Sequence, residues 1–136
     1  MSGGERWAEA VRWLRYAKED LNTAEVLFRD DCISRHICWL AQHSVEKALK
    51  SIFVFLQVDF PRSHDLDLLR NLIPEGWSVG VTEVDLAALS EWAVESRYPG
   101  DWPDATPNDA KAALEHARII LDLVVADYAT RGFRLA

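Results

Sequence analysis

The segment around Arg97 and Tyr98 carries the residues best suited to recognise a ligand. The sequence SRYPGDWPD combines an arginine, two aromatic residues (Tyr98 and Trp102) and two prolines. A guanidinium forms paired hydrogen bonds with phosphates and carboxylates, and aromatic rings stack on bases or on partner side chains. In the alternative interpretation, the rings hold the loop on the rest of the domain and Arg97 pairs with Asp101 or Asp104. The sequence leaves both interpretations open.

Glu46, Lys47 and Lys50 form a second candidate site. They lie on the polar edge of an otherwise apolar segment, and Glu46 precedes Lys50 by four residues, the favourable order for a helical ion pair. This spacing favours an ordinary surface ion pair of small energetic value. The alternative is a cleft in which Lys47 or Lys50 contacts an anionic group of a ligand.

His64 and Asp65 resemble the central pair of metal-dependent HD phosphohydrolases. Such a site needs imidazole and carboxylate ligands that converge on one metal. Because the pair follows a proline turn and opens a short helical pattern, we favour capping of that helix by Ser63, His64 and Asp65. His36 and His43 are seven residues apart, too far for a helical metal pair. We therefore predict no metal and no other cofactor.

Composition and charge narrow the class of protein. The chain has 136 residues, 49% of them hydrophobic, and a net charge of -7, which suits one acidic domain with one core. Such a chain repels phosphate backbones and anionic lipid, so we expect neither duplex DNA nor a membrane as a partner. Two cysteines, a polar start and no apolar run of about 20 residues favour the cytoplasm. The sequence has no P-loop, Rossmann glycine pattern or nucleophile elbow.

Apolar residues recur every three or four positions along most of the chain, and this period predicts helices. We expect long helices at about residues 6–28 and 33–55, another that opens at Thr82, and a last one that Thr106 and Pro107 introduce. A short helix over residues 64–73 is expected to begin with Ser63 as its N-cap. The sequence thus predicts one all-α domain, residues 1–136, folded as an up-and-down four-helix bundle with one extra short helix.

Two features of these helices predict a symmetric homodimer. Trp13 and Tyr16 lie off the main apolar stripe of the first helix. The second helix has an apolar arc too wide for one layer of neighbours. A second copy of the chain would cover such surplus apolar surface.

Several stretches, taken in order, resemble the HEPN family, the small helical domains of prokaryotes and higher eukaryotes. The matching residues are Asp20-Leu21 through Leu27-Phe28, residues 38–50 (CWLAQHSVEKALK), His64-Asp65-Leu66, Arg97-Tyr98-Pro99, Asp109-Ala110 and Ala117. The resemblance covers roughly residues 8 to 128. It implies a helical up-and-down bundle that is commonly a homodimer. Family members pair with a minimal nucleotidyltransferase in toxin–antitoxin systems, bind nucleotides, or act as metal-independent ribonucleases.

The sequence departs from the ribonuclease members of that family. Those members carry an arginine followed four to six residues later by a histidine, late in the fold, whereas here no histidine follows Arg97 until His116. Without the usual general base, we expect a non-catalytic, dimeric module that binds a nucleotidyltransferase-type protein, a nucleotide, or both. The alternative is a ribonuclease toxin with an unconventional active site. The expected binding residues are Arg97, Tyr98, Lys47, Lys50, Glu46, His64 and Asp65.

Overall fold

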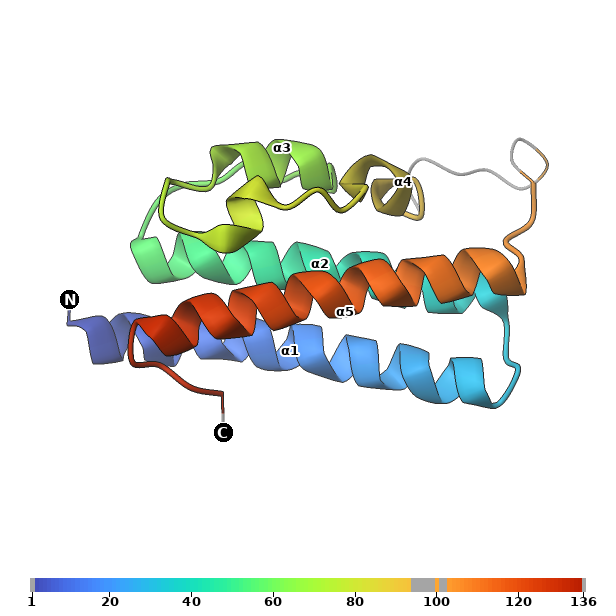
Figure 1. The fold of residues 1–136 in the computed structure, drawn as a ribbon, viewed down its shortest axis with the longest axis horizontal. Helices are drawn as coiled ribbons and strands as arrows, with labels where there is room; N and C mark the ends of the chain where they lie inside the picture. Colours follow the sequence, from blue (N-terminus) through green and yellow to red (C-terminus); the bar gives the residue numbers. More distant parts are fainter. Residues whose placement is uncertain (1, 94–99, 101–102, 136) are drawn as a thin grey trace.

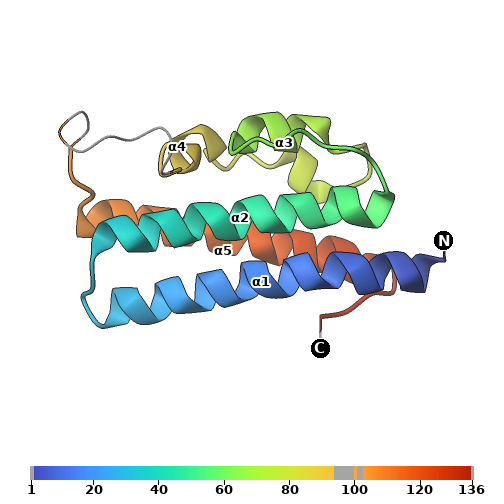
Figure 2. The ribbon, with the colours of Figure 1, turned by 180° about the vertical axis from the view of Figure 1, so that it is seen from behind.

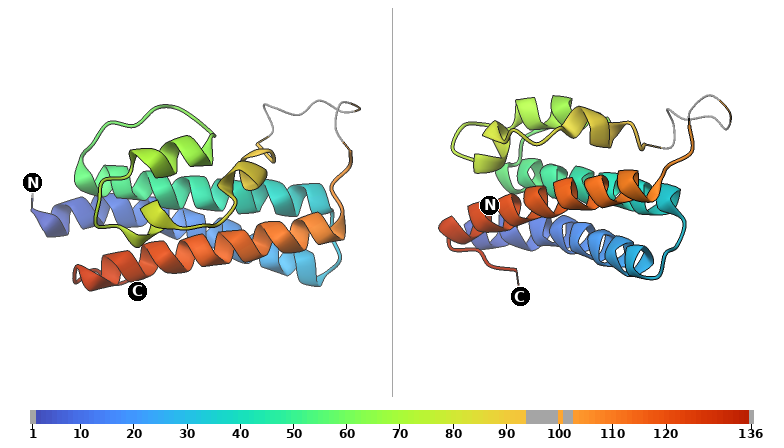
Figure 3. Two further views of the ribbon diagram at one scale, coloured as in Figure 1. Left: turned by 45° about the horizontal axis from the view of Figure 1, so that its top comes forward. Right: turned by 45° about the vertical axis from the view of Figure 1, so that its right-hand side comes forward.

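The computed structural model describes residues 2–93, 100 and 103–135, and over these residues it contains helices and loops but no strand. Three long helices lie side by side along the molecule (Figure 1): α1 (Gly3–Arg29), α2 (Ser34–Leu56) and α5 (Pro107–Thr130). Three short helices form a further layer on the side away from α1 (Figure 3): α3 (Leu66–Leu72), the 3-10 helix η1 (Ser78–Val81) and α4 (Leu86–Ser90). The predicted all-α class is confirmed.

The chain passes up and down the bundle, and its third pass is broken. Figures 1 and 2 show that α2 returns antiparallel to α1 and that α5 runs in the same direction as α2. Between them the chain crosses back through α3, η1 and α4. The sequence predicted a long helix that opens at Thr82. In the described part of the chain this helix is α4, which has only five residues.

Local hydrogen bonds explain why α4 begins late. The Thr82 hydroxyl accepts a hydrogen bond from the Val84 backbone N–H within the loop, so it does not cap α4. Asp85 is the N-cap instead, and its carboxylate accepts a hydrogen bond from Ala88 N at 3.0 Å. At the end of α4, the Ser90 hydroxyl accepts a hydrogen bond from Leu66 N at 2.9 Å. The short helix is thus tied to the start of α3.

The other caps agree in part with the sequence. Thr106 and Asp109 form the predicted capping box at the start of α5, with hydrogen bonds of 3.1 and 2.9 Å. The N-cap of α3 is Asp65, whose carboxylate accepts a hydrogen bond from Leu68 N at 3.1 Å. Ser63 instead accepts a hydrogen bond from the Asp65 backbone N–H. The predicted Ser63 cap is therefore corrected by two residues.

Helix α2 lies at the centre of the packing, and its wide apolar arc, from which the sequence predicted a second copy, is covered by helices of the same chain. It contacts α1 and α5 on one side and α3 and α4 on the other. Leu49, Ile52 and Phe53 are fully buried, and each such side chain contributes about 1.5–3 kcal/mol by leaving water. Because neighbouring helices cover α2 on both sides, several of its polar side chains, among them Gln42, Glu46 and Lys50, are buried. None of the helices in the described ranges is long and apolar enough to cross a membrane.

Candidate functional site

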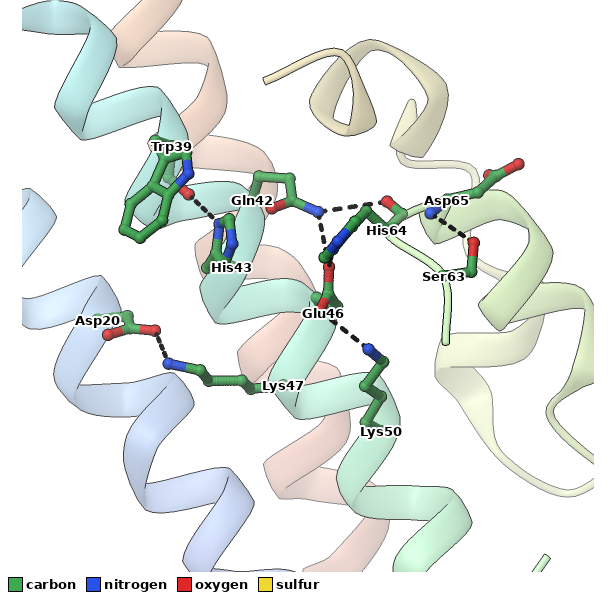
Figure 4. Close-up of polar contacts among 10 residues, drawn as sticks. All are labelled: Asp20, Trp39, Gln42, His43, Glu46, Lys47, Lys50, Ser63, His64 and Asp65. Carbon is green, nitrogen blue, oxygen red and sulfur yellow. Dashed lines mark hydrogen bonds and ion pairs between the residues drawn. The ribbon is translucent and has the colours of Figure 1, made fainter. Parts of the chain in front are cut away.

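A row of polar and aromatic side chains lies on one side of α2, next to the loop that precedes α3 (Figure 4). Its members on α2 recur three or four residues apart, so they share one side of the helix. His64 joins them from the loop between α2 and α3. We call this set the α2 polar strip, and it consists of Trp39, Gln42, His43, Glu46, Lys50 and His64.

Glu46 is the centre of the strip. Its Oε1 atom accepts hydrogen bonds from Gln42 Nε2 at 3.1 Å and from His64 Nδ1 at 2.7 Å. Its Oε2 atom accepts one from Lys50 Nζ at 3.0 Å. Gln42 also donates to the His64 backbone carbonyl at 3.3 Å. One buried carboxylate therefore fixes the loop before α3 against α2.

The pKa of Glu46 is lowered below its ordinary value of 4.5. Burial by itself raises this pKa, because it disfavours the charged form. Hydrogen bonds from His64, Lys50 and Gln42, together with the charge of Lys50, outweigh burial and lower it. The carboxylate is thus ionised at neutral pH and accepts hydrogen bonds from all three partners.

This direction gives a prediction about pH and stability. A carboxyl whose pKa is lower in the folded state stabilises the fold above its unfolded pKa, and that contribution is lost as the pH falls through the folded value. We expect the difference in unfolding free energy between wild type and Glu46→Gln to be constant near neutral pH and to shrink below pH 4.5. Urea unfolding of both proteins across this range would measure it, and a difference that grows on acidification would contradict it.

The structure corrects the interpretation of Glu46 and Lys50 as an ordinary surface ion pair. Their side chains are only 9% and 11% exposed. Lys47 points the other way, toward α1, where its ammonium lies 2.6 Å from Asp20 (Figure 4). The two lysines therefore do not converge on one anion, and each is already paired with a carboxylate.

Two buried atoms of the α2 polar strip have no hydrogen-bond partner in the described part of the chain. They are the Trp39 indole Nε1, a donor, and the Gln42 amide Oε1, an acceptor. Between them, the His43 ring packs on the Trp39 ring with centroids 4.0 Å apart, and His43 Nδ1 lies 2.9 Å from the Trp39 carbonyl. A buried polar group without a partner costs about 1–3 kcal/mol. This end of the strip therefore holds one donor and one acceptor, and a ligand would reach them only after the side chains around them move, because Gln42 is fully buried.

Comparison with known proteins identifies the family. A family model described as the HEPN domain matches residues 10–128. This chain belongs to the HEPN domain family. The resemblance seen in the sequence is thereby confirmed over residues 10–128, nearly the whole length of the chain.

Solved structures share the fold of this HEPN domain. TT1696 from Thermus thermophilus superposes with a TM-score of 0.74 at 25% sequence identity, covering 87% of this chain and 97% of that one. ST0689, described as an archaeal HEPN homologue, gives a TM-score of 0.64 at 23% identity, covering 85% of this chain and 93% of that one. A search of curated proteins finds no match.

His64 and Asp65 have different structural roles in this HEPN domain. Asp65 caps α3, as the favoured interpretation expected, whereas His64 turns to Glu46 on α2 and does not cap the helix. Within the described ranges, no group of three or more histidine, cysteine and acidic residues is arranged to hold a metal ion. His36 is exposed and lies outside the α2 polar strip.

The remaining predicted site residues, Arg97 and Tyr98, lie outside the described residues. The described site also includes three residues that the sequence did not single out as binding groups: Trp39, Gln42 and His43. The spacing could have identified Gln42. It lies four residues before Glu46, so the two side chains are on the same side of a helix whose other sides are apolar. Trp39 gave no such signal, since a tryptophan in an apolar segment is usually a core residue.

Proposed function

We propose that this HEPN domain is a non-catalytic, dimeric binding module that binds a nucleotidyltransferase-type protein, a nucleotide, or both. The chain belongs to the HEPN family, whose domains often dimerise. The resemblance to that family implies, for some members, pairing with a minimal nucleotidyltransferase in toxin–antitoxin-like systems. The late arginine–histidine spacing of the ribonuclease members is absent from this sequence. The proposal thus assigns recognition to the site and gives it no bond-breaking role.

The state of the α2 polar strip carries the proposal. Its charged groups, Glu46 and Lys50, are paired with each other inside the fold. A proton-transfer site needs a group that can exchange protons at the operating pH, and the lowered pKa of Glu46 disfavours that role. The hydrogen-bonding atoms without partners, on Trp39 and Gln42, are neutral. A neutral donor and acceptor next to two closely packed aromatic rings suit the edge of a nucleobase or the backbone of a protein partner, once the side chains that enclose them move aside.

In this proposal, Arg97 and Tyr98 supply the contacts that the strip lacks. The two lysines are occupied by carboxylates, so an anionic ligand of this acidic chain needs another cation. Arg97, in the sequence between α4 and α5, is the residue we assign to that contact. Tyr98 would stack beside it on a base or a partner side chain.

One observation favours the ribonuclease alternative. The rings of His43 and His64 lie with centroids 6.1 Å apart, and each has its Nδ1 atom within hydrogen-bonding distance of an acceptor. Two imidazoles held in this way can act as acid and base in cleavage of RNA. The binding module and the ribonuclease therefore differ in whether these two histidines are needed for turnover.

Purification from the native host tests the binding proposal. The tagged protein would be isolated under mild conditions and analysed by intact mass spectrometry for bound proteins and small molecules. We expect a nucleotidyltransferase-type protein or a nucleotide to be retained at near-stoichiometric amounts, and to be lost from a Gln42→Leu variant that folds normally. A preparation that carries neither, from cells in which the protein is expressed at its natural level, would contradict the proposal.

A further inference from the structure

A groove on the outer face of α1 and α2 lies away from the α2 polar strip. Figure 2 shows these two helices side by side on a face that no other helix of the described chain covers. The groove has a volume of about 510 Å³, and its lining residues are Glu9, Arg12, Trp13, Tyr16, Lys47 and Val54. Tyr16 is 59% exposed, although it is a large aromatic residue. Exposed aromatic surface beside a hollow is typical of a contact with another protein.

The α1 side of the groove has a particular symmetry. Glu9, Arg12, Trp13 and Tyr16 share one side of the helix, and they are arranged evenly about the midpoint between Arg12 and Trp13. If a second α1 lies antiparallel across this midpoint, Glu9 meets Tyr16 of the second copy, and Arg12 meets its Trp13. A carboxylate accepts a hydrogen bond from a phenol, and a guanidinium binds the face of an indole. Each residue therefore faces a group with which it interacts favourably.

We propose that this groove is the interface of the homodimer, with two α1 helices packed antiparallel about a two-fold axis between Arg12 and Trp13. The inference deepens the proposed function, because it rests on the dimer assigned there and names the surface that forms it. A two-fold interface uses the same patch on both copies, so self-complementarity of the kind shown by Glu9 and Tyr16 is its requirement. The order of Glu9, Arg12, Trp13 and Tyr16 is complementary to itself when reversed, which a second copy of this chain requires and an unrelated protein does not.

Length and charge agree with this arrangement. About 30 Å of α1 can overlap with an antiparallel second copy around this midpoint. Two chains of net charge -7 repel one another in general, but the groove is locally balanced, since Arg12 offsets Glu9 and Lys47 is bonded to Asp20. The bond from Lys47 also offsets the charge of Asp20, which this arrangement brings near Glu5 of the second copy. The face is thus one on which two acidic copies can meet.

Tyr16→Glu tests the interface. It places two carboxylates, Glu9 and the new side chain of the second copy, opposite each other twice in every dimer. We expect the dissociation constant of the dimer to rise about ten-fold or more, measured by analytical ultracentrifugation across the micromolar range. The matched control is Val81→Glu, which adds the same charge at a side chain that is 82% exposed on η1, and it should leave the dimer unchanged. Circular dichroism would confirm that both variants fold.

A compensating change makes the test specific. Glu9→Arg combined with Tyr16→Glu in one chain restores attraction between copies, so the dissociation constant should return toward that of the wild type. The two positions are about 10 Å apart along one helix, too far to pair within a chain. A wild-type dimer that Tyr16→Glu leaves intact would overturn this interface while the dimer itself stands. A wild-type monomer throughout the micromolar range would overturn both the interface and the proposed dimer.

Discussion

Replacing Glu46 with alanine is expected to lower the free energy of unfolding by about 3–5 kcal/mol, the usual effect of removing one partner from a buried ion pair. The change leaves the ammonium of Lys50, whose side chain is 11% exposed, without its carboxylate. It also removes the acceptor for Gln42 and His64, and so loosens the loop before α3. Chemical denaturation monitored by circular dichroism would measure the loss.

Two controls separate burial from charge in this experiment. Glu25 also forms an ion pair, with Arg118, but their side chains are 33% and 47% exposed, so Glu25→Ala should cost less than about 1 kcal/mol. The double variant Glu46→Ala/Lys50→Met should be more stable than Glu46→Ala alone, because it removes the uncompensated charge as well. Equal stability losses for Glu46→Ala and Glu25→Ala would show that the α2 polar strip is not a buried network.

Arg97→Ala should weaken ligand or partner binding by about 1–3 kcal/mol, the cost of losing a charge-assisted hydrogen bond. The loss is expected because the lysines near the site, Lys47 and Lys50, are engaged with carboxylates. Titration calorimetry with the four ribonucleoside triphosphates and with the co-purified partner would measure it. Arg97→Lys, which keeps the charge but not the planar fork, should recover part of the binding.

The thermal stability of Arg97→Ala distinguishes a binding role of Arg97 from a structural one. If Arg97 acts in binding, the melting temperature of Arg97→Ala should stay near that of the wild type, because a charge exposed to a ligand contributes little to folding. If the variant instead unfolded more readily while its folded fraction bound as before, Arg97 would hold the loop in place and the binding site would lie elsewhere.

Local sequence predicted the long helices well. The apolar period of α1 and α2 and the capping box of Thr106 and Asp109 depend on residues within one or two turns of each other, and the structure confirms them. The broken third pass was less predictable. Helix α4 ends at Ser90, whose hydroxyl accepts a hydrogen bond from Leu66, 24 residues away in the sequence, and no local pattern reveals such a contact.

The same limit applies to the site. The spacing of Glu46 and Lys50 correctly predicted a helical ion pair, but spacing does not reveal what covers that side of the helix. The contact of His64 with Glu46 joins residues 18 apart, and that of Lys47 with Asp20 joins residues 27 apart. The first contact depends on how the loop before α3 folds back over α2, and the second depends on how α1 packs against α2. No local pattern encodes either arrangement.

An RNA-cleavage assay tests most directly whether this HEPN domain binds or cuts. Purified protein would be incubated with single-stranded RNA, and the products separated on a denaturing gel beside those of His43→Ala/His64→Ala and His116→Ala. We predict that the wild type leaves the RNA as intact as the variants do, because no histidine follows Arg97 at the ribonuclease spacing. Cleavage by the wild type that falls about 100-fold or more in His43→Ala/His64→Ala would contradict the account and establish a ribonuclease with an unconventional site.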